Sequence, residues 1–408
     1  MIPMFVRKSK QNMMDVQENA KHTFMDKIAK GQYREENTKC LCGGGEDVLL
    51  TDIDRYGIPF KTVICKRCGL MRANPYYSDE TITEFYKEEY SPLYRELDTC
   101  DEKFWEKYVK YGEERVDWIE NRVGNLTGKK VYEIGCGSGA TLYCFQNRGA
   151  EVCGCDYGEK FMQFGKEKGV TILCGEWDTL KEQGKADIIV INHVLEHIKN
   201  PLEYLKDIKV LMKENALLYI GVPFISQIEL GVYEYDLFRY VQNAHAWYFS
   251  EETLGAIVKA AGYEISEVRK GEYLMCTPKG EEKDFIEPVN GEYECTIQHL
   301  KTWDRVLDII LKYKDTAAQK EEQRKEVLEE KEQILESRVQ LQEERKQLVE
   351  ERNELRIEKQ ELLQKNKEEH EKRLELLEER KKLVEEKNGL LEDRKHLREE
   401  IKELKNRK

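Results

Sequence analysis

A group of glycines follows a short apolar segment near the middle of the chain. Residues 131–134 read Val-Tyr-Glu-Ile and are followed by Gly135, Gly137 and Gly139 at alternate positions. Residues 140–146 then have a helix-like composition. Glycines, which lack Cβ atoms, let a ligand lie against the backbone at a helix N-terminus, where N–H groups lack partners. The spacing therefore predicts a strand, a sharp turn and a helix that together bind a ligand.

Two acids flank this loop. Glu133 stands just before it, and Asp156 ends a second apolar run, residues 151–155. A carboxylate at the end of the second strand is placed to accept hydrogen bonds from both hydroxyls of a ribose. The site is therefore predicted to bind a nucleoside-like cofactor. Residues 135–140 also fit the dinucleotide pattern G-x-G-x-x-G/A, so the glycines alone leave a nicotinamide-linked enzyme as the alternative.

Three histidines are candidates for a general base. His193 and His197 follow an apolar segment, residues 188–192, and their spacing predicts that both lie on one helical face, with Glu196 adjacent. His245 is expected in a loop before a helix. A neutral histidine, with an ordinary pKa of about 6.5, can accept the proton of a hydroxyl. The alternatives are that these histidines have packing or capping roles, or that the pair and Glu196 assist catalysis by binding a metal.

Four cysteines form two close pairs. Cys40 and Cys42 make the first pair, Cys65 and Cys68 the second, and a glycine follows each pair. Two thiolate pairs on tight turns can supply four sulfur ligands in a tetrahedron, which suits a structural zinc ion. The alternative is four reduced thiols without a metal. The chain has 12 cysteines, and the others are scattered through apolar segments, where they act as small apolar side chains.

Longer stretches of the sequence resemble a known enzyme family. Residues 186–197, 200–202 and 216–223 are similar to the fourth and fifth strands of class I S-adenosylmethionine-dependent methyltransferases. Residues 194–197, Val-Leu-Glu-His, and residues 245–254 resemble the subgroup that methylates sugars and other small hydroxylated molecules. This resemblance implies S-adenosylmethionine as the cofactor and favours a methyltransferase over a nicotinamide-linked enzyme.

The resemblance also implies roles for single residues. Glu133, Asp156 and the three loop glycines would hold the methionine and ribose parts of S-adenosylmethionine. Glu176 matches a position that often reaches the adenine amine, and Trp177 beside it could cover the ring. An ordinary loop acid and a packing aromatic are the alternatives for these two. In the related ubiquinone-pathway O-methyltransferases, acids near the position of His197 help to hold a divalent ion.

The second cysteine pair carries a resemblance of its own. Residues 65–75, Cys-Lys-Arg-Cys-Gly-Leu-Met-Arg-Ala-Asn-Pro, resemble half of the zinc-binding N-terminal module of methyltransferases from antibiotic-sugar and surface-polysaccharide pathways. The first pair departs from that family, because it reads C-x-C where the family has C-x-x-C.

Apolar residues recur every seven positions from residue 320 onward. A sustained period of seven predicts a left-handed coiled coil, about 130 Å long if it is helical throughout. Basic residues at the second seam position leave dimer and trimer both open. A single helix held by Glu to Lys or Arg pairs is the alternative. The repeating positions are Val327, Ile334, Leu341, Leu348, Leu355, Leu362, Leu376, Leu383, Leu390, Leu397 and Leu404, interrupted at Glu369.

These features must be positioned by an α/β architecture. Between residues 129 and 278 strands alternate with helices, the pattern of a parallel sheet covered on both faces. We therefore predict a Rossmann-like, seven-stranded class I methyltransferase sheet with a small N-terminal zinc module and a long C-terminal α-helical coiled coil. The expected parts are a polar, helical segment (1–38), the zinc module (39–77), a helical linker or cap (78–128), the methyltransferase domain (129–278), a connection with an amphipathic helix (279–319) and the coiled coil (320–408).

Composition excludes several classes of protein. The 408 residues carry a formal net charge of −13, which does not give the basic face needed to bind nucleic acid. The N-terminal residues lack the order of a signal peptide, and no apolar run of about 18 residues could span a bilayer. We expect a cytoplasmic protein, and a peripheral position at the inner face of the membrane is compatible with this expectation.

The resulting hypothesis is O-methylation of a sugar hydroxyl in a bacterial surface glycan. A methyltransferase domain followed by a long coiled coil resembles the arrangement in bacterial O-antigen chain-terminating methyltransferases. This resemblance implies capping of a terminal sugar. The expected partners are a sugar or glycan acceptor, further copies of this chain in a dimer or trimer, and a membrane-associated polysaccharide-synthesis complex. The alternatives are C-methylation of a nucleotide-linked sugar and a non-catalytic scaffold for the coiled coil.

Overall fold

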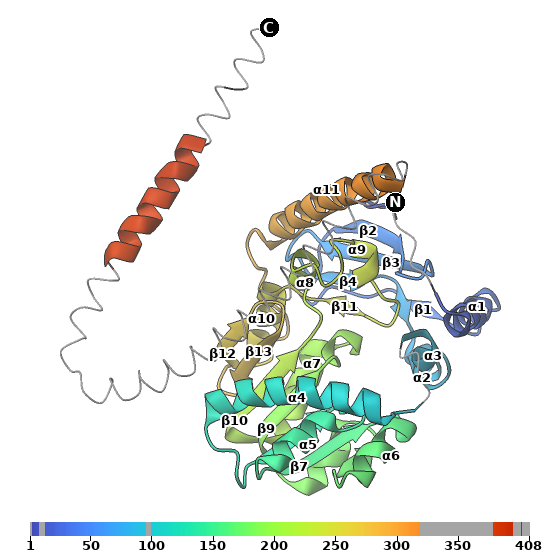
Figure 1. Ribbon diagram of the computed structural model, residues 1–408, viewed down its shortest axis with the longest axis vertical. Helices are drawn as coiled ribbons and strands as arrows, with labels where there is room; N and C mark the ends of the chain where they lie inside the picture. The colour runs from blue at the N-terminus through green and yellow to red at the C-terminus, as the bar shows by residue number, and fades with distance from the viewer. Residues whose placement is uncertain (1, 8–12, 95–98, 319–377, 395–400, 402–408) are drawn as a thin grey trace. The chain divides into compact units, whose positions relative to one another are not determined.

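The computed structural model describes residues 2–7, 13–94, 99–318, 378–394 and 401 (Figure 1). The chain falls into two units, Met1–Tyr313 and Lys314–Lys408. The described residues of the first unit contain a seven-stranded sheet, a four-stranded sheet and a two-stranded pair.

The large sheet has the order β12-β13-β10-β9-β6-β7-β8. Neighbours from β10 to β8 are parallel, whereas β13 is antiparallel to both β10 and β12. This mixed, seven-stranded sheet confirms the predicted α/β, Rossmann-like methyltransferase fold. Its strands are β6 (Lys130–Ile134), β7 (Glu151–Asp156), β8 (Ile172–Cys174), β9 (Ala186–Asn192), β10 (Met212–Gly221), β12 (Glu264–Arg269) and β13 (Tyr273–Thr277).

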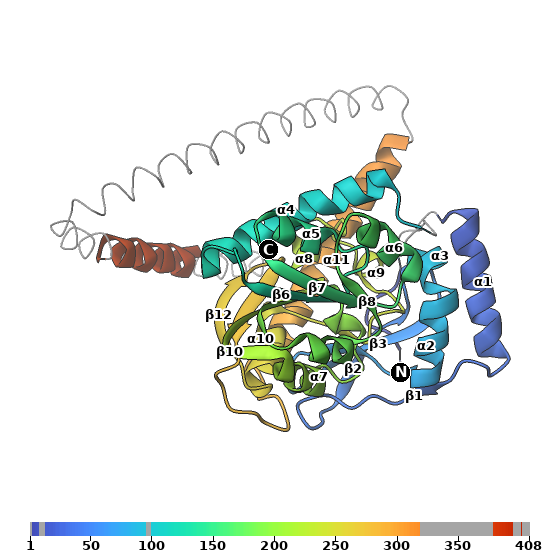
Figure 2. The same cartoon turned by 90° about the horizontal axis from the view of Figure 1, so that it is seen from below.

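The central strand β9 is apolar along nearly its whole length because both faces of the sheet are covered. Ile188 and Val190 pack into one core with α4 and α5, and Ile189 and Ile191 pack into a second core with α7 and α10. The two layers are visible in Figure 2. The covering helices are α4 (Glu102–Val123) and α5 (Ala140–Asn147) on one face, and α7 (Pro201–Asp207) and α10 (Glu251–Ala260) on the other; α6 (Glu159–Glu167) packs beside β8.

The small sheet combines strands from distant parts of the chain, in the order β11-β4-β3-β2. Strands β2 (Asp47–Ile53), β3 (Pro59–Cys65) and β4 (Met71–Ala73) come from the predicted zinc module, and β11 (Trp247–Tyr248) comes from the predicted methyltransferase domain. Strand β11 pairs antiparallel with β4. The cysteine-bearing module and the methyltransferase part therefore share one hydrogen-bonded sheet.

An aromatic core joins the N-terminal helices to the methyltransferase part. Phe24 packs against Phe85 and Tyr77 with ring centroids 5.3 and 5.5 Å apart. Tyr86 and Tyr90 present their rings to His197 at 5.8 and 6.0 Å. These contacts fix the N-terminal helices beside the histidine region. The elements are α1 (Asp15–Ala29), β1 (Glu35–Glu36), which pairs with β5 (Tyr76–Tyr77), α2 (Asp79–Glu88) and α3 (Tyr90–Tyr94).

Helix α11 (Glu292–Ala318) docks on the first unit through a buried stripe that includes Leu300, Trp303 and Leu307. Its N-terminus lies against the turn of the second cysteine pair: a Cβ on Gly69 would come within 2.8 Å of the carbonyl carbon of Glu292. The remaining short elements are the 3₁₀ turns η1 (Trp177–Gln183), η2 (Leu195–His197) and η3 (Ile208–Leu211), and the helices α8 (Ser226–Glu229) and α9 (Leu237–Tyr240).

In the second unit the structure describes a helix over residues 378–394. Leu383 and Leu390, which occupy the predicted seam, are 63% and 70% exposed. Most of the predicted coiled coil lies outside the described residues, so the coiled coil stays a prediction. None of the helices in the described ranges is long and apolar enough to cross a membrane.

Candidate active site

The predicted glycine loop connects β6 to α5, and its three glycines have different surroundings. All three adopt a left-handed φ, between 56° and 77°. A Cβ on Gly135 would lie 2.3 Å from Val194 Cγ2, and one on Gly139 would lie 2.7 Å from Ile172 Cδ1. No described atom lies within 4 Å of the corresponding point on Gly137. Gly135 and Gly139 therefore allow close packing within the chain, and Gly137 leaves room for a ligand.

Asp156 ends β7 and holds this loop in place. Its Oδ2 accepts a hydrogen bond from Gly137 N at 2.8 Å, and its Oδ1 accepts one from Gly158 N at 2.7 Å. A carboxylate offers about four lone-pair positions, so these two bonds leave acceptor capacity for a ligand. The side chain is only partly buried. Asp156 can thus shape the loop and bind a hydroxylated ligand at the same time.

Glu133 is the buried acid of the site, only 4% exposed, at the end of β6. Burial raises its pKa from 4.5 to about 7, and the charge of Arg115 opposes that shift. Oε2 of Glu133 has no hydrogen-bond partner among the described residues. Arg115 comes from α4 and donates to Thr141 Oγ1 at 2.7 Å. Sequence reasoning missed Arg115, because no local pattern ties this residue of a surface helix to the loop.

The structure separates the two residues predicted to contact adenine. Glu176 is exposed and directly precedes η1. Burial raises the pKa of Tyr157, and a hydrogen bond with Glu176 raises it further. Trp177 packs against the main core, with Lys181 Nζ 4.6 Å over its ring. Tyr157 directly follows Asp156, is 66% exposed, and was missed by sequence reasoning. Its position after a ribose-binding acid was the available signal.

The prediction that His193 and His197 share a helical face is wrong. Residues 195–197 form one 3₁₀ turn, and His193 precedes it with a left-handed φ of 55°. The reason is tertiary: His193 N donates to Gly221 O at 2.9 Å, which keeps it aligned with β10, and Val194 then packs on Gly135. The chain turns too sharply at this point for a helix to begin.

The four predicted catalytic side chains nevertheless meet. Glu196 Oε1 lies 3.3 Å from His193 Nδ1 and 3.7 Å from His197 Nε2. The rings of His197 and His245 are 4.9 Å apart. Glu196 and His245 are almost fully buried, whereas the His193 side chain is 59% exposed. Since Val194 contacts Gly135, this histidine cluster lies directly beside the glycine loop.

The hydrogen bonding of His197 fixes its protonation pattern. Its Nδ1 lies 3.0 Å from Ala244 O. A carbonyl oxygen only accepts, so Nδ1 carries the proton and Nε2 of the neutral ring keeps a lone pair. That lone pair and Glu196 Oε1 are both acceptors, so a proton, a hydroxyl or a cation must bridge them when both are unprotonated. Burial lowers the pKa of His245 well below its usual value, and the charges of His197 and Arg55 lower it further.

The ligand atoms of Glu196, His197 and His245 all lie within 4.8 Å of one another. This arrangement has the dimensions of a three-ligand metal site. The histidine cluster therefore has two chemical capacities: proton transfer through His197 and coordination of a cation.

The four predicted cysteine ligands also come together. The Sγ–Sγ distances are 3.4 Å for Cys40–Cys68, 3.5 Å for Cys40–Cys42 and 3.7 Å for Cys42–Cys65. Tetrahedral zinc with Zn–S bonds of about 2.3 Å separates its sulfurs by about 3.8 Å. All four thiols are buried. Hydrogen bonds from Cys40 and Cys68 lower the pKa of Cys65, and hydrogen bonds with Cys40 and Cys65 raise the pKa of Cys68. The geometry fits such an ion.

Part of the chain is similar to known methyltransferases. Residues 108–268 match the family model described as a methyltransferase domain. The ubiquinone biosynthesis O-methyltransferase of Bordetella avium is 26% identical over 177 residues, covering 40% of this chain and 73% of the relative. The protein of that name from Pseudomonas aeruginosa is 28% identical over 168 residues, covering 38% and 72%. Magnesium protoporphyrin IX methyltransferase from Synechocystis aligns with 49% of this chain and 99% of its own, at 19% identity and a TM-score of 0.36.

Residues 108–268 are a class I S-adenosylmethionine-dependent methyltransferase domain. The protein is accordingly an enzyme, an S-adenosylmethionine-dependent methyltransferase, as the sequence predicted. This result removes the nicotinamide-linked enzyme and the non-catalytic scaffold from the alternatives.

The raised pKa of Glu133 predicts a pH-dependent stability. Between pH 4.5 and about 7, Glu133 is protonated in the folded protein and ionised in the unfolded chain. Stability therefore falls as the pH rises through this window, by up to about 3 kcal/mol. Glu133→Gln has no such proton, so its stability should not fall in this way. The free energy of unfolding of Glu133→Gln minus that of the wild type should therefore increase between about pH 5 and about pH 8. Urea unfolding at several pH values measures this gain. The exposed Glu151→Gln is the control, and a constant difference for Glu133→Gln would contradict the assignment.

Proposed function

We propose that this protein transfers the methyl group of S-adenosylmethionine to a hydroxyl oxygen of a sugar or glycan, with His197 as the general base. The carrying observation is the contact of His197 Nδ1 with Ala244 O, which leaves Nε2 as a proton acceptor beside the glycine loop. The sites of the two substrates would then adjoin, as methyl transfer requires.

Several features of the loop fit the donor. S-adenosylmethionine supplies an electrophilic methyl group on a positively charged sulfur. Gly137 leaves room for its methionine part, and the free lone pairs of Asp156 suit the two ribose hydroxyls. The unpaired Oε2 of Glu133 suits an ammonium group, because a buried carboxylate oxygen is costly without a donor. Glu176 and Tyr157 are the candidates at the adenine end, while Trp177 is committed to the core.

The histidine cluster supplies the proton acceptor. An acceptor hydroxyl placed between His197 Nε2 and Glu196 would lose its proton to Nε2 as its oxygen bonds to the methyl carbon, while the bond from that carbon to sulfur breaks and S-adenosylhomocysteine leaves. The carboxylate of Glu196, 3.7 Å from Nε2, would stabilise the imidazolium that forms. The Ala244 carbonyl keeps the ring in the tautomer that this step needs. Positioned general bases of this kind contribute roughly 100-fold to 10,000-fold in rate.

The surroundings of the cluster favour a polyhydroxylated acceptor. Tyr86 and Tyr90 border His197, and Asn243 and Tyr94 lie close by. Aromatic rings with hydroxyl and amide groups can stack on a sugar ring and form hydrogen bonds with its hydroxyls.

Capping of a bacterial surface glycan, in contact with a membrane-associated synthesis complex, remains our proposal on the basis of the seven-residue repeat. C-methylation of a nucleotide-linked sugar would differ in the NMR shift of the new methyl group.

A second candidate is metal-assisted O-methylation of an acceptor of the kind used in ubiquinone biosynthesis. The relatives named ubiquinone biosynthesis O-methyltransferase favour it, and so does the 4.8 Å grouping of Glu196, His197 and His245. In this case the three residues would hold a divalent cation, which lowers the pKa of a bound hydroxyl. The two candidates differ in whether Mg²⁺ alone restores the activity that a chelator removes, because a chelator would also remove the proposed structural zinc ion.

Two substitutions separate donor binding from proton transfer. Asp156→Asn should weaken binding of S-adenosylhomocysteine by at least about tenfold, because it loses a charged acceptor for ribose. His197→Gln should leave that affinity nearly unchanged and lower kcat by about 100-fold or more. Calorimetry and a methyl-transfer assay provide the two readouts, with the exposed His22→Gln as control. Unchanged donor binding by Asp156→Asn would count against the site, and a loss of wild-type activity in EDTA that Mg²⁺ alone reverses would favour the second candidate.

The cysteine group should contain about one zinc ion per chain. Cys65→Ser should abolish it and loosen residues 244–248, because β11 is paired with the module through β4. Binding of S-adenosylhomocysteine should persist, since the glycine loop lies on the large sheet. Metal analysis and hydrogen exchange measure the two effects. Cys174→Ser, at an exposed thiol, is the control. Reduced wild-type protein that folds normally without zinc would contradict this proposal.

The proposed coiled coil predicts an oligomer. Both Leu383 and Leu390 are exposed in the single chain, and in a coiled coil a neighbouring helix would cover them. Replacing both by Asp should therefore weaken association. Glu385→Gln with Glu392→Gln has the same seven-residue spacing off the seam and is the matched control. Sedimentation velocity of the full chain measures the mass. A monomeric wild type, or an unchanged mass for the Asp variant, would favour the single-helix alternative.

A further inference from the structure

Unsatisfied polar atoms gather where the small sheet and α3 meet the histidine cluster. Among the described residues, the buried side-chain atoms without a hydrogen-bond partner include Arg55 Nε, Asn243 Nδ2, His245 Nδ1 and both carboxylate oxygens of Glu196. Folded proteins satisfy about nine in ten such atoms. A local concentration of unsatisfied ones therefore indicates a place that a polar ligand completes.

Arg55 is the permanently charged cation in this group. It stands in the turn between β2 and β3, and its main chain is tied on both sides. Its N–H donates to Val241 O at 2.9 Å, and its carbonyl oxygen accepts from Arg7 Nη2 at 2.6 Å. Asp54 Oδ1 braces the same turn by accepting from two later backbone N–H groups, each at 2.8 Å. The side chain of Arg55 thus extends from a rigid point.

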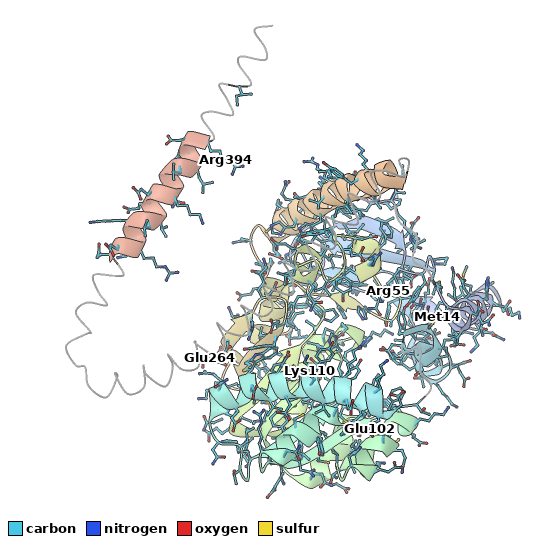
Figure 3. The ribbon with its side chains drawn as sticks, viewed as in Figure 1. Met14, Arg55, Glu102, Lys110, Glu264 and Arg394 are labelled. Atoms are coloured by element: carbon cyan, nitrogen blue, oxygen red, sulfur yellow. The ribbon has the colours of Figure 1, made fainter. Side chains whose placement is uncertain are left out.

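The pairing of backbone segments places Arg55 close to the histidine cluster. Its N–H is bonded to Val241 O, and Val241 lies four residues before His245, whose own N–H donates to Gln242 O at 3.1 Å. Burial raises the pKa of Tyr233, and Arg55 opposes that rise. Figure 3 labels Arg55 between the small sheet and the large one. Asp54 faces the same charge, yet no described acid forms an ion pair with Arg55 within 4.0 Å.

The two ends of this region differ in hydrogen-bonding character. Tyr94 OH donates to Asn243 Oδ1, and Asn243 Nδ2, which faces the buried hydroxyl of Tyr77, makes no hydrogen bond among the described residues. Arg55 adds the donors of its guanidinium. At the opposite end, Glu196 and His197 Nε2 only accept. Arg55 and His193 both remain accessible to solvent, which leaves a route of entry.

On the basis of the methyl transfer proposed above, we infer that Arg55, together with Asn243, binds an anionic group of the acceptor, a phosphate or a carboxylate, while the hydroxyl to be methylated lies between Glu196 and His197. A guanidinium binds such groups through two parallel N–H donors of fixed geometry. A neutral acceptor would leave the Arg55 donors unpaired in a partly buried place. The substrate class is therefore a sugar that carries a negative charge.

Calorimetry on the full chain tests this assignment, with and without S-adenosylhomocysteine. Glucose 1-phosphate, glucuronate and methyl glucoside serve as the phosphate, carboxylate and neutral probes. Wild type should bind at least one of the anionic probes about tenfold or more tightly than the neutral one. Arg55→Gln should abolish this preference, and Arg55→Lys should retain part of it. Lys61→Gln, at an exposed cation of β3, is the matched control and should behave as wild type.

The outcomes separate the two proposals. Equal binding of charged and neutral probes by wild type would overturn the role of Arg55, as would an unchanged preference in Arg55→Gln. Which anion binds more tightly distinguishes a sugar phosphate from a uronate. The affinity for S-adenosylhomocysteine should be the same in all variants. If the wild type did not bind S-adenosylhomocysteine, the proposed methyl transfer itself would be in question. The anion preference measured in the absence of S-adenosylhomocysteine would still decide the role of Arg55.

Discussion

The site depends on one short segment, residues 244–248, that is bonded on both sides. Ala246 O accepts from Ala73 N of β4, and Ala246 N donates to the backbone oxygen of Glu196, both at 2.9 Å. Ala244 O accepts from Tyr76 OH at 2.8 Å and also contacts His197 Nδ1. A two-residue strand pair alone is weak. Here it joins the cysteine module to the histidine cluster because each of its neighbours is itself fixed.

This connection explains why a cysteine module can matter to methyl transfer while it lies outside the large sheet. A zinc ion would hold the two cysteine turns together, and the turns carry β3 and β4. Strand β4 then aligns β11, and the residues just before β11 orient His197. The donor site has no such dependence, because its loop is held by Asp156 and by packing on Val194 and Ile172. The proposed acceptor side and the proposed donor side therefore rest on different parts of the fold.

Local patterns predicted the glycine loop and its flanking strands, because their determinants are local. The apolar runs before Gly135 and Asp156 form β6 and β7, and the glycines form the turn. The error at His193 and His197 came from treating a four-residue spacing as a helix. The pairing of His193 with Gly221 and the packing of Val194 on Gly135 override that spacing. Arg55 was not predicted as a site residue, since its turn lies near the segment of His245 only through the pairing of segments distant in sequence.

The chemistry of the acceptor side follows from what lies between His197 Nε2 and Glu196 Oε1, which are 3.7 Å apart. Two unprotonated acceptors at this distance repel each other in a buried setting, where charges interact strongly. A hydroxyl between them relieves the repulsion by donating to one, and its oxygen becomes more nucleophilic as the proton leaves. A cation relieves the same repulsion by binding both. Base catalysis and metal assistance are thus two solutions to one electrostatic problem. The charge of Arg55 favours the first, because it makes an added cation nearby less stable and an anionic acceptor more stable.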